Sequence, residues 1–99
     1  MSDYEAFLRE DARLIMLREL HKQTDGRLNE TLVTKALDVF GHNRSREWVR
    51  TELRKLEELG AVRIAEAGSI MIAAITRSGV DHVERRAVIE GVARPSPGA

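Results

Sequence analysis

The amino-acid sequence predicts a single, mainly α-helical domain that carries one small β-hairpin. Apolar residues recur at helical spacing in four stretches, and between the third and fourth stretches the spacing changes to that of β-strands. The chain has 99 residues, which suffices for one modest core. We expect the domain to occupy residues 1–90. A flexible tail is expected over residues 91–99, because its prolines and glycines cannot continue a helix.

The first helix is expected over residues 2–22. Ser2 followed three residues later by Glu5 is a capping-box pattern, in which side chains satisfy backbone N–H groups that the first helical turn leaves free. Gly26 then marks a turn over residues 24–27. The helix has a broad apolar face, made of Phe7, Leu8, Leu14, Ile15, Leu17 and Leu20.

Two shorter helices follow, and a tight link at residues 42–44 joins them. Asn29 is the expected N-cap of the second helix, and Gly41 ends it. The third helix begins after Asn43 or Ser45 and ends at Gly60. Its buried stripe is expected to consist of Val49, Leu53, Leu56 and Leu59.

Residues 61–65 and 70–75 are typical of two strands joined by a short link that contains Gly68, which indicates a hairpin. The second strand is apolar on both faces, so we expect both faces to be covered. Thr76 or Ser78 caps a last helix over residues 79–90. The second helix, the tight link and the third helix form a helix-turn-helix. Because the hairpin follows directly as a wing, the sequence predicts a winged helix-turn-helix.

Composition limits the classes of function. The chain has 16 basic and 16 acidic residues, and a net charge of zero counts against a strongly basic nucleic-acid-binding protein. It has no cysteine, which excludes disulfides and thiolate metal sites. The acidic, polar N-terminus does not fit a secretory signal, and the longest apolar run, residues 70–75, is too short to span a bilayer. We therefore expect a cytoplasmic protein with no membrane association.

The sequence contains no pattern that indicates catalysis. His21, His42 and His82 lack the spacing of a metal site. The serines lie at expected caps or turns, without a neighbouring base, and glycine-rich phosphate loops are absent. We expect neither an enzyme nor a bound metal or cofactor.

Two segments resemble bacterial winged-helix regulators of the MarR and ArsR type. Residues 53–62, LRKLEELGAV, are similar to the turn that ends their recognition helix, and residues 75–79, ITRSG, are similar to the entry into their last helix. The resemblance covers about residues 29–86 and implies a winged-helix fold. The sequence departs from these families in its short wing, where Arg63 is the only basic residue, and in lacking the cysteine ligands of metal-sensing relatives.

A second resemblance spans nearly the whole chain. Residues 25–29, DGRLN, and residues 91–97, GVARPSP, are similar to segments of small winged-helix proteins encoded by Mu-like phages and prophages. The function of those proteins is largely unestablished, so this resemblance implies a fold and a phage origin more than an activity.

The third helix carries the candidate site for double-stranded DNA. Residues 44–55 contain five basic and two acidic residues, a local balance of +5 − 2 = +3. Arginine and glutamate bond guanine and cytosine, and a recognition helix places its N-terminal half in the major groove. The expected base readers are Arg46, Glu47, Arg50 and Thr51, beside the cap Ser45; the expected phosphate contacts are Arg44, Arg54 and Lys55, with Arg63 on the wing.

The sequence therefore leaves two hypotheses for the function. The first is a phage-encoded transcriptional regulator that places the third helix in the major groove. The second is a protein-interaction module that binds a host or phage protein and no nucleic acid. A continuous positive stripe from Arg44 to Arg54 favours DNA, whereas acidic neighbours from the first two helices favour a protein partner.

A homodimer through the first and last helices is a further expectation. Aromatic and apolar residues at the start of the first helix are suited to packing on the last helix of a second copy. The residues of this interface are Tyr4, Phe7 and Leu8 on one side, and Val88, Ile89 and Val92 on the other.

Overall fold

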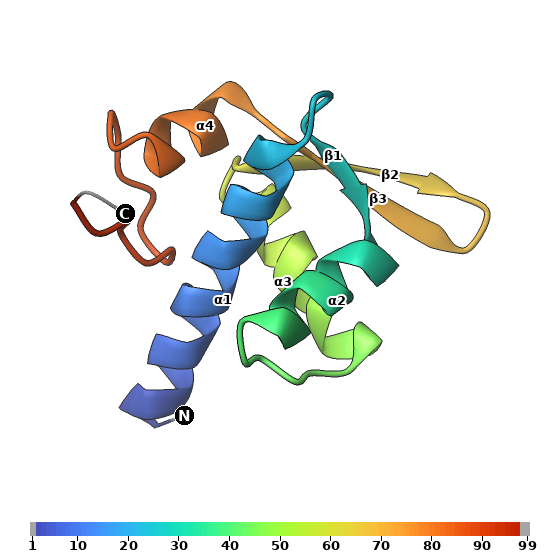
Figure 1. Ribbon diagram of the computed structural model, residues 1–99, viewed down its shortest axis with the longest axis horizontal. Coiled ribbons are helices and arrows are strands. Elements are labelled where there is room, and N and C mark those ends of the chain that lie inside the picture. The colour runs from blue at the N-terminus through green and yellow to red at the C-terminus, as the bar shows by residue number, and fades with distance from the viewer. Residues whose placement is uncertain (1, 98–99) are drawn as a thin grey trace.

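The computed structural model describes residues 2–97, and within them the chain forms four helices and three strands. Figure 1 shows the long helix α1 crossing the front of the molecule and the β2–β3 hairpin projecting beyond the helices. In chain order the elements are α1 (Asp3–Lys22), β1 (Arg27–Asn29), α2 (Glu30–Val39), α3 (Arg46–Glu58), β2 (Val62–Ala67), β3 (Ile70–Ile75) and α4 (Arg77–Val83).

The predicted starts of α1, α2 and α3 are confirmed by capping hydrogen bonds, whereas α4 begins at Arg77, two residues before the expected position 79. The Ser2 hydroxyl accepts a bond from the amide of Glu5 at 3.2 Å, and the Ser45 hydroxyl accepts one from Trp48 at 3.1 Å. Asn29 caps α2, where its side-chain oxygen accepts from the Leu32 amide at 2.9 Å. Between the two possible caps of α4 the structure selects Thr76, which accepts from the Gly79 amide.

The expected hairpin is part of a three-stranded antiparallel sheet in the order β1-β3-β2. The short strand β1 is a correction to the predicted element order. Leu28 of β1 and Ile64 of β2 both pair with Ala73 of β3, so β3 is the central strand. This position fits its apolar character on both faces. The pairing joins segments more than 40 residues apart, so no local pattern in residues 27–29 indicates it.

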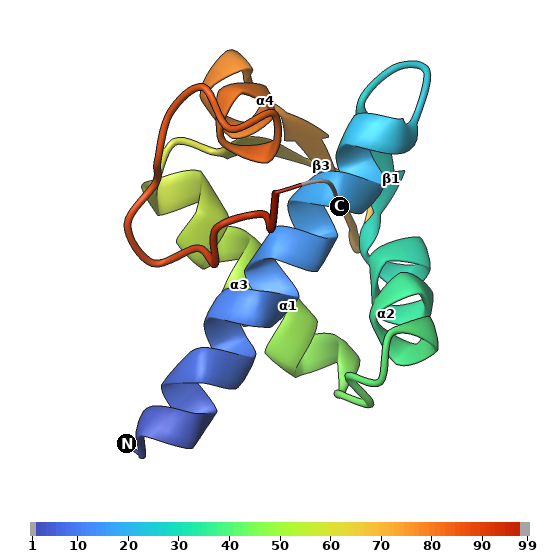
Figure 2. The same ribbon diagram turned by 60° about the vertical axis from the view of Figure 1, so that its left-hand side comes forward.

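The core lies where α1 meets the other helices and the sheet. Figure 2 shows α2 and α4 on opposite sides of α1, with α3 crossing behind it. The predicted stripe of α3 is confirmed for Val49, Leu53 and Leu56, which are fully buried, while Leu59 is partly buried. Other fully buried core side chains are Ala12, Met16, Leu17, Leu20, Val33, Leu37 and Ala73.

The last helix is shorter than predicted. It ends at Val83 instead of residue 90, because Arg85 adopts a positive φ of 65° and the Arg86 amide bonds the Asp81 carbonyl at 2.8 Å. A residue in this left-handed conformation reverses the chain and ends a helix.

The segment after α4 packs beyond the boundary expected at residue 90. It returns along α1, where the Ala93 amide donates to the Glu10 carbonyl at 3.1 Å (Figure 2). The imidazole of the buried His82 lies 2.9 Å from the Ala93 carbonyl, and Val92 is buried. Residues 91–93, which the sequence placed in a flexible tail, are therefore part of the packed body.

Gly79 gives a test of this packing. A Cβ added there would lie 2.4 Å from the Ala61 carbonyl oxygen and 2.7 Å from a carbon of Ile75. Although alanine favours an exposed helix over glycine by about 1 kcal/mol, we expect Gly79→Ala to lower the free energy of unfolding by roughly 1–3 kcal/mol through overpacking. Urea denaturation followed by circular dichroism measures this. The matched variant Ser78→Ala, on the exposed side of α4, should stay within about 0.5 kcal/mol. Equal stability of the two variants would contradict this packing.

Candidate nucleic-acid interface

The candidate DNA-binding helix α3 is tied to α2 through one buried carboxylate. Glu30 is the first residue of α2 and its side chain is fully buried. One carboxylate oxygen accepts from Arg46 Nε at 2.5 Å, and the other accepts from Arg50 Nη1 at 2.5 Å. The Met71 amide of β3 donates to the same carboxylate at 2.5 Å. Glu30 therefore joins α2, α3 and the sheet at a single point.

The charge of Glu30 is maintained by these donors. Burial alone would raise the pKa of its carboxyl, but the Met71 amide and the guanidinium groups of Arg46 and Arg50 outweigh burial and lower the pKa from 4.5 to about 2. In return, the hydrogen bond to Glu30 raises the pKa of Arg50. Glu30 is ionised at neutral pH, and both arginines are engaged by it.

Two further arginines of the predicted site, Arg44 and Arg54, also have acidic partners. Arg54 lies 2.8 Å from Glu66 of β2 and 3.3 Å from Glu57. Arg44 lies 3.4 Å from Glu5 of α1, and its guanidinium stacks 4.5 Å from the centre of the Trp48 ring. The carboxylates around the α3 face therefore come from α1, α2, α3 and β2.

The structure brings the predicted residues to one side of α3 but does not form the continuous positive stripe. Ser45 serves as the N-cap, Glu47 is exposed, and the Thr51 hydroxyl donates to the Glu47 carbonyl of its own helix. Lys55 and Arg63 are exposed, and they make no ion pair within residues 2–97. Of the six basic residues predicted to bind DNA, these two keep their charge unpaired.

A second buried carboxylate holds the other side of α3. Glu52 accepts from Arg9 Nη1 at 2.6 Å and from Arg13 Nε at 2.7 Å, and both arginines belong to α1. Arg13 also donates to the Gly91 carbonyl at 2.7 Å, which links α3 to the segment after α4. Glu52 lies among the buried residues of α3, so its carboxylate needs hydrogen-bonding partners, and α1 supplies them.

Sequence reasoning missed Glu30 as a partner of the site. Arg46 and Arg50 lie four residues apart, so they share one helix face, which was read as a face for DNA. The residue that they bind lies 16 and 20 residues earlier. The one available signal was a carboxylate at the first position of the second helix, on the same face as the apolar Val33 and Leu37.

Apolar side chains are exposed on two other surfaces. Leu32, Val39 and Phe40 form an α2 apolar patch, in which their exposed fractions are 47%, 81% and 54%. Leu32 and Val39 are seven residues apart, so they lie within about 20° of each other around the helix. At the start of α1, Tyr4 and Phe7 are also exposed.

Within residues 2–97, no three His, Asp or Glu side chains gather in a way that could hold a metal ion. The described helices also include none that is both long and apolar enough to cross a bilayer.

We expect Glu30→Gln to lower the free energy of unfolding by roughly 2–3 kcal/mol. Breaking a buried ion pair typically costs about 3–5 kcal/mol, but here the arginines left behind are partly exposed to water, with 49% and 27% of their side-chain surface accessible. Urea denaturation at neutral pH measures the loss. Glu58→Gln, which removes an exposed carboxylate of the same protein, is the control and should change little. If both variants lost the same stability, Glu30 would have no special role.

The interaction of Glu30 with Arg46 and Arg50 also predicts that the free energy of unfolding depends on pH. Because the folded-state pKa of Glu30, about 2, lies below its ordinary value of 4.5, its stabilising effect is complete above pH 4.5 and is lost as the pH falls towards 2. The stability difference between wild type and Glu30→Gln should therefore be largest near neutral pH and narrow below pH 4.5. Comparing the two proteins removes the effect of Asp81 and Glu84, whose pKa values Arg86 also lowers. A difference that stays constant down to acid pH would contradict this assignment.

Comparison with known proteins identifies relatives in phages and bacteria. No family model matches the chain, and no solved structure matches it. The chain is 37% identical over 92 residues to the uncharacterized protein gp26 of Escherichia phage Mu, a match that covers 93% of this chain and 95% of gp26. It is 36% identical over 75 residues to an uncharacterized protein of Haemophilus influenzae, covering 75% of this chain and 72% of that protein. The chain belongs to the family of phage Mu gp26.

Proposed function

We propose that this chain is a winged-helix protein of a Mu-like phage that acts by contacting another protein. The winged-helix assignment rests on the element order. The helices α2 and α3 follow each other through a short link, as in a helix-turn-helix, and the β2–β3 hairpin comes directly after α3. The relationship to phage Mu gp26 supports the phage origin, and with it the host cytoplasm as the place of action.

The observation that carries the protein-contact function is the neutralisation of the α3 face. Four carboxylates pair with four of the six basic residues of the predicted site, which leaves a balance of +6 − 4 = +2, and exposed Glu47 reduces this to +1. Phosphate contacts supply most of the non-specific affinity for DNA, and they need cations that are not already paired. Acidic neighbours from α1 and α2 are the arrangement that the sequence associated with a protein partner.

The α2 apolar patch is a second, independent observation that supports the protein-contact function. Val39, the last residue of α2, exposes 81% of its surface and the C-cap Phe40 exposes 54%, although the inner face of the helix is well packed. Exposed apolar side chains that gather on one surface mark sites of protein contact. We therefore place the contact with a phage or host protein at the outer face of α2, with Leu32 and Val39 as its central residues.

Affinity capture tests this assignment. The tagged protein is expressed during phage growth, and its partners are compared with those of Leu32→Ser/Val39→Ser. We expect a partner that wild type captures and the double variant loses, because the variant removes apolar contact area without touching the core. Lys35→Ser/Asp38→Ser, which changes exposed polar residues of the same helix, is the control and should keep the partner. Capture that does not depend on Leu32 and Val39 would refute the α2 contact.

DNA binding is the second candidate, and the unpaired charges of Lys55 and Arg63 favour it. Arg46 and Arg54 also keep 49% and 47% of their side-chain surface exposed. In this account a duplex would be held through the C-terminal half of α3 and the wing. The proposed protein-contact function instead predicts negligible affinity for random duplex DNA at near-physiological salt.

Fluorescence anisotropy with random duplex DNA at two salt concentrations distinguishes the candidates. Wild type binds DNA in a salt-dependent way if the DNA function is correct. Lys55→Glu/Arg63→Glu should then abolish this binding, and Lys35→Glu should retain it. This set of results would establish the DNA function against our proposal. Arg46→Glu/Arg50→Glu is unsuitable as a test, because it would remove both cationic partners of the buried Glu30 carboxylate and place two like charges beside it, which would destabilise the fold itself.

A further inference from the structure

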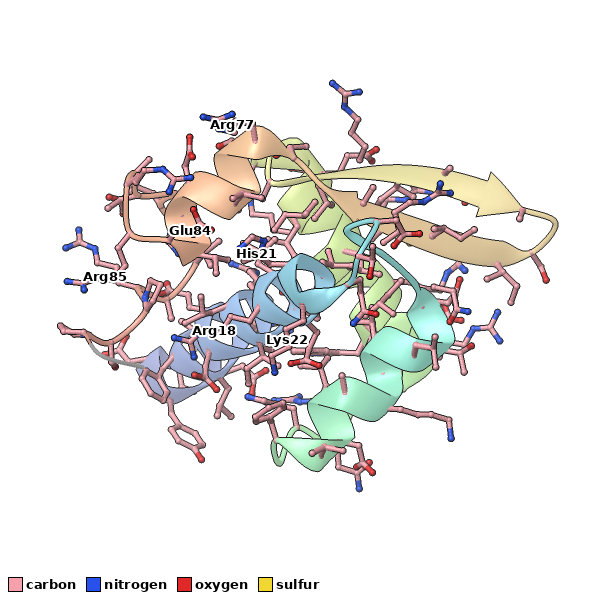
Figure 3. All side chains as sticks on the ribbon, turned by 45° about the horizontal axis from the view of Figure 1, so that its top comes forward. Arg18, His21, Lys22, Arg77, Glu84 and Arg85 are labelled. Atoms are coloured by element: carbon pink, nitrogen blue, oxygen red, sulfur yellow. The ribbon has the colours of Figure 1, made fainter. Side chains whose placement is uncertain are left out.

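One side of α1 has an exposed aromatic end and an exposed basic end. Tyr4 and Phe7, near the N-terminus, expose 70% and 63% of their surface. Arg18 and Lys22 lie on the same side of the helix, because spacings of three and four residues connect all four through positions 11 and 15. Figure 3 shows Arg18 and Lys22 projecting from α1.

A groove runs along the basic half of this side. It has a volume of about 600 Å³, with Ile15, Arg18 and Lys22 on its α1 side and with Phe40 and Val83 among its other lining residues. Asp11 and Glu19 also line the groove, and Lys22 Nζ lies 2.8 Å from the Glu19 carboxylate, so the groove carries charges of both signs around its apolar residues. Lys22 already lies 5.8 Å from the centre of the Phe40 ring, so its position beside an aromatic ring is established in the fold.

Charge along α1 is divided in the same way. Apart from Arg9 and Arg13, which bind Glu52 of α3, residues 3–11 contain four acidic residues, a sum of −4, whereas residues 12–22 contain two basic residues and one acidic residue, a sum of +1. Two copies of α1 that run in opposite directions bring each acidic, aromatic half against a basic, grooved half. Two copies that run in the same direction bring like charges together.

We propose that the chain forms a two-fold symmetric dimer in which the α1 helices pack antiparallel, and in which the aromatic end of each helix occupies the groove of the other copy. With the two-fold axis near residue 13, Tyr4 of one copy lies opposite Lys22 of the second copy, and Phe7 lies opposite Arg18. Lysine and arginine over an aromatic face attract it through a cation–π interaction. Because the surface is complementary to itself, the association is closed at two copies.

This dimer replaces the interface expected from the sequence. Ile89 and Val92 were expected to pack on a second copy, but they are buried in their own chain, with exposed fractions of 9% and 4%. They pack with the core and hold the segment after α4. Tyr4 and Phe7 keep their expected role as interface residues, and their contact moves from α4 to α1.

Sedimentation equilibrium over a range of micromolar concentrations tests the association. We expect wild type to be a dimer and Phe7→Ser to raise the dissociation constant by about tenfold or more. Val39→Ser, which removes a comparably exposed apolar side chain from α2, should leave it unchanged. Circular dichroism confirms that each variant is folded. A monomeric wild type, or a dimer that Phe7→Ser leaves intact, would overturn the proposal.

Thiol cross-linking tests the antiparallel geometry, since the chain has no cysteine of its own. Single variants Tyr4→Cys and Lys22→Cys are treated with a short bifunctional thiol reagent, alone and as an equal mixture. We expect a covalent dimer only in the mixture, because two Tyr4→Cys thiols lie roughly 27 Å apart in the antiparallel pair at 1.5 Å per residue. Efficient cross-linking of Tyr4→Cys alone, or no cross-linking in the mixture, would contradict the antiparallel geometry.

Discussion

The structure depends on the carboxylate of Glu30, which is buried where α2, α3 and β3 meet. A buried charge is tolerated only when opposite charges and hydrogen bonds surround it. Here two guanidinium groups from α3 and one backbone amide from β3 supply them. The position of α3 is therefore fixed by an electrostatic requirement of α2 as well as by the leucines of its inner face.

On its other side, α3 is held by a second arrangement of the same kind. Glu52 binds Arg9 and Arg13 of α1, and Arg13 continues to the Gly91 carbonyl. Two buried glutamates with two arginines each thus connect α1, α2, α3, the sheet and the segment after α4. This arrangement limits what these arginines can bind. An arginine that pairs with a buried carboxylate cannot move to a phosphate or a base edge, because the carboxylate would then be left charged and unpaired in the apolar interior. Lys55 at the end of α3 and Arg63 on the β2–β3 hairpin have no such constraint.

The sequence predicted what local patterns determine, and it failed where distant segments meet. Ser2 and Asn29 were identified as caps, and Ser45 as one of two possible caps, because a cap acts on residues two or three positions away. The stripe of α3 follows from its spacing alone. In contrast, β1 exists only through its pairing with β3, and the early end of α4 depends on the conformation of one arginine. The charge of the candidate site could not be predicted for the same reason. Arg46 and Arg50 share one helix face, but the charge of that face depends on Glu30 from another helix, and no spacing in the sequence connects them.

The central claim is that Glu30 and the arginines of α3 form one interacting unit that the fold needs. A double-mutant cycle of Glu30→Gln and Arg50→Gln, measured by urea denaturation, tests it most directly. The account predicts that the two substitutions are strongly non-additive, with a coupling free energy of about 1–3 kcal/mol. A coupling near zero would mean that Arg50 does not serve Glu30 in solution, and that the arginines of α3 are available to another partner.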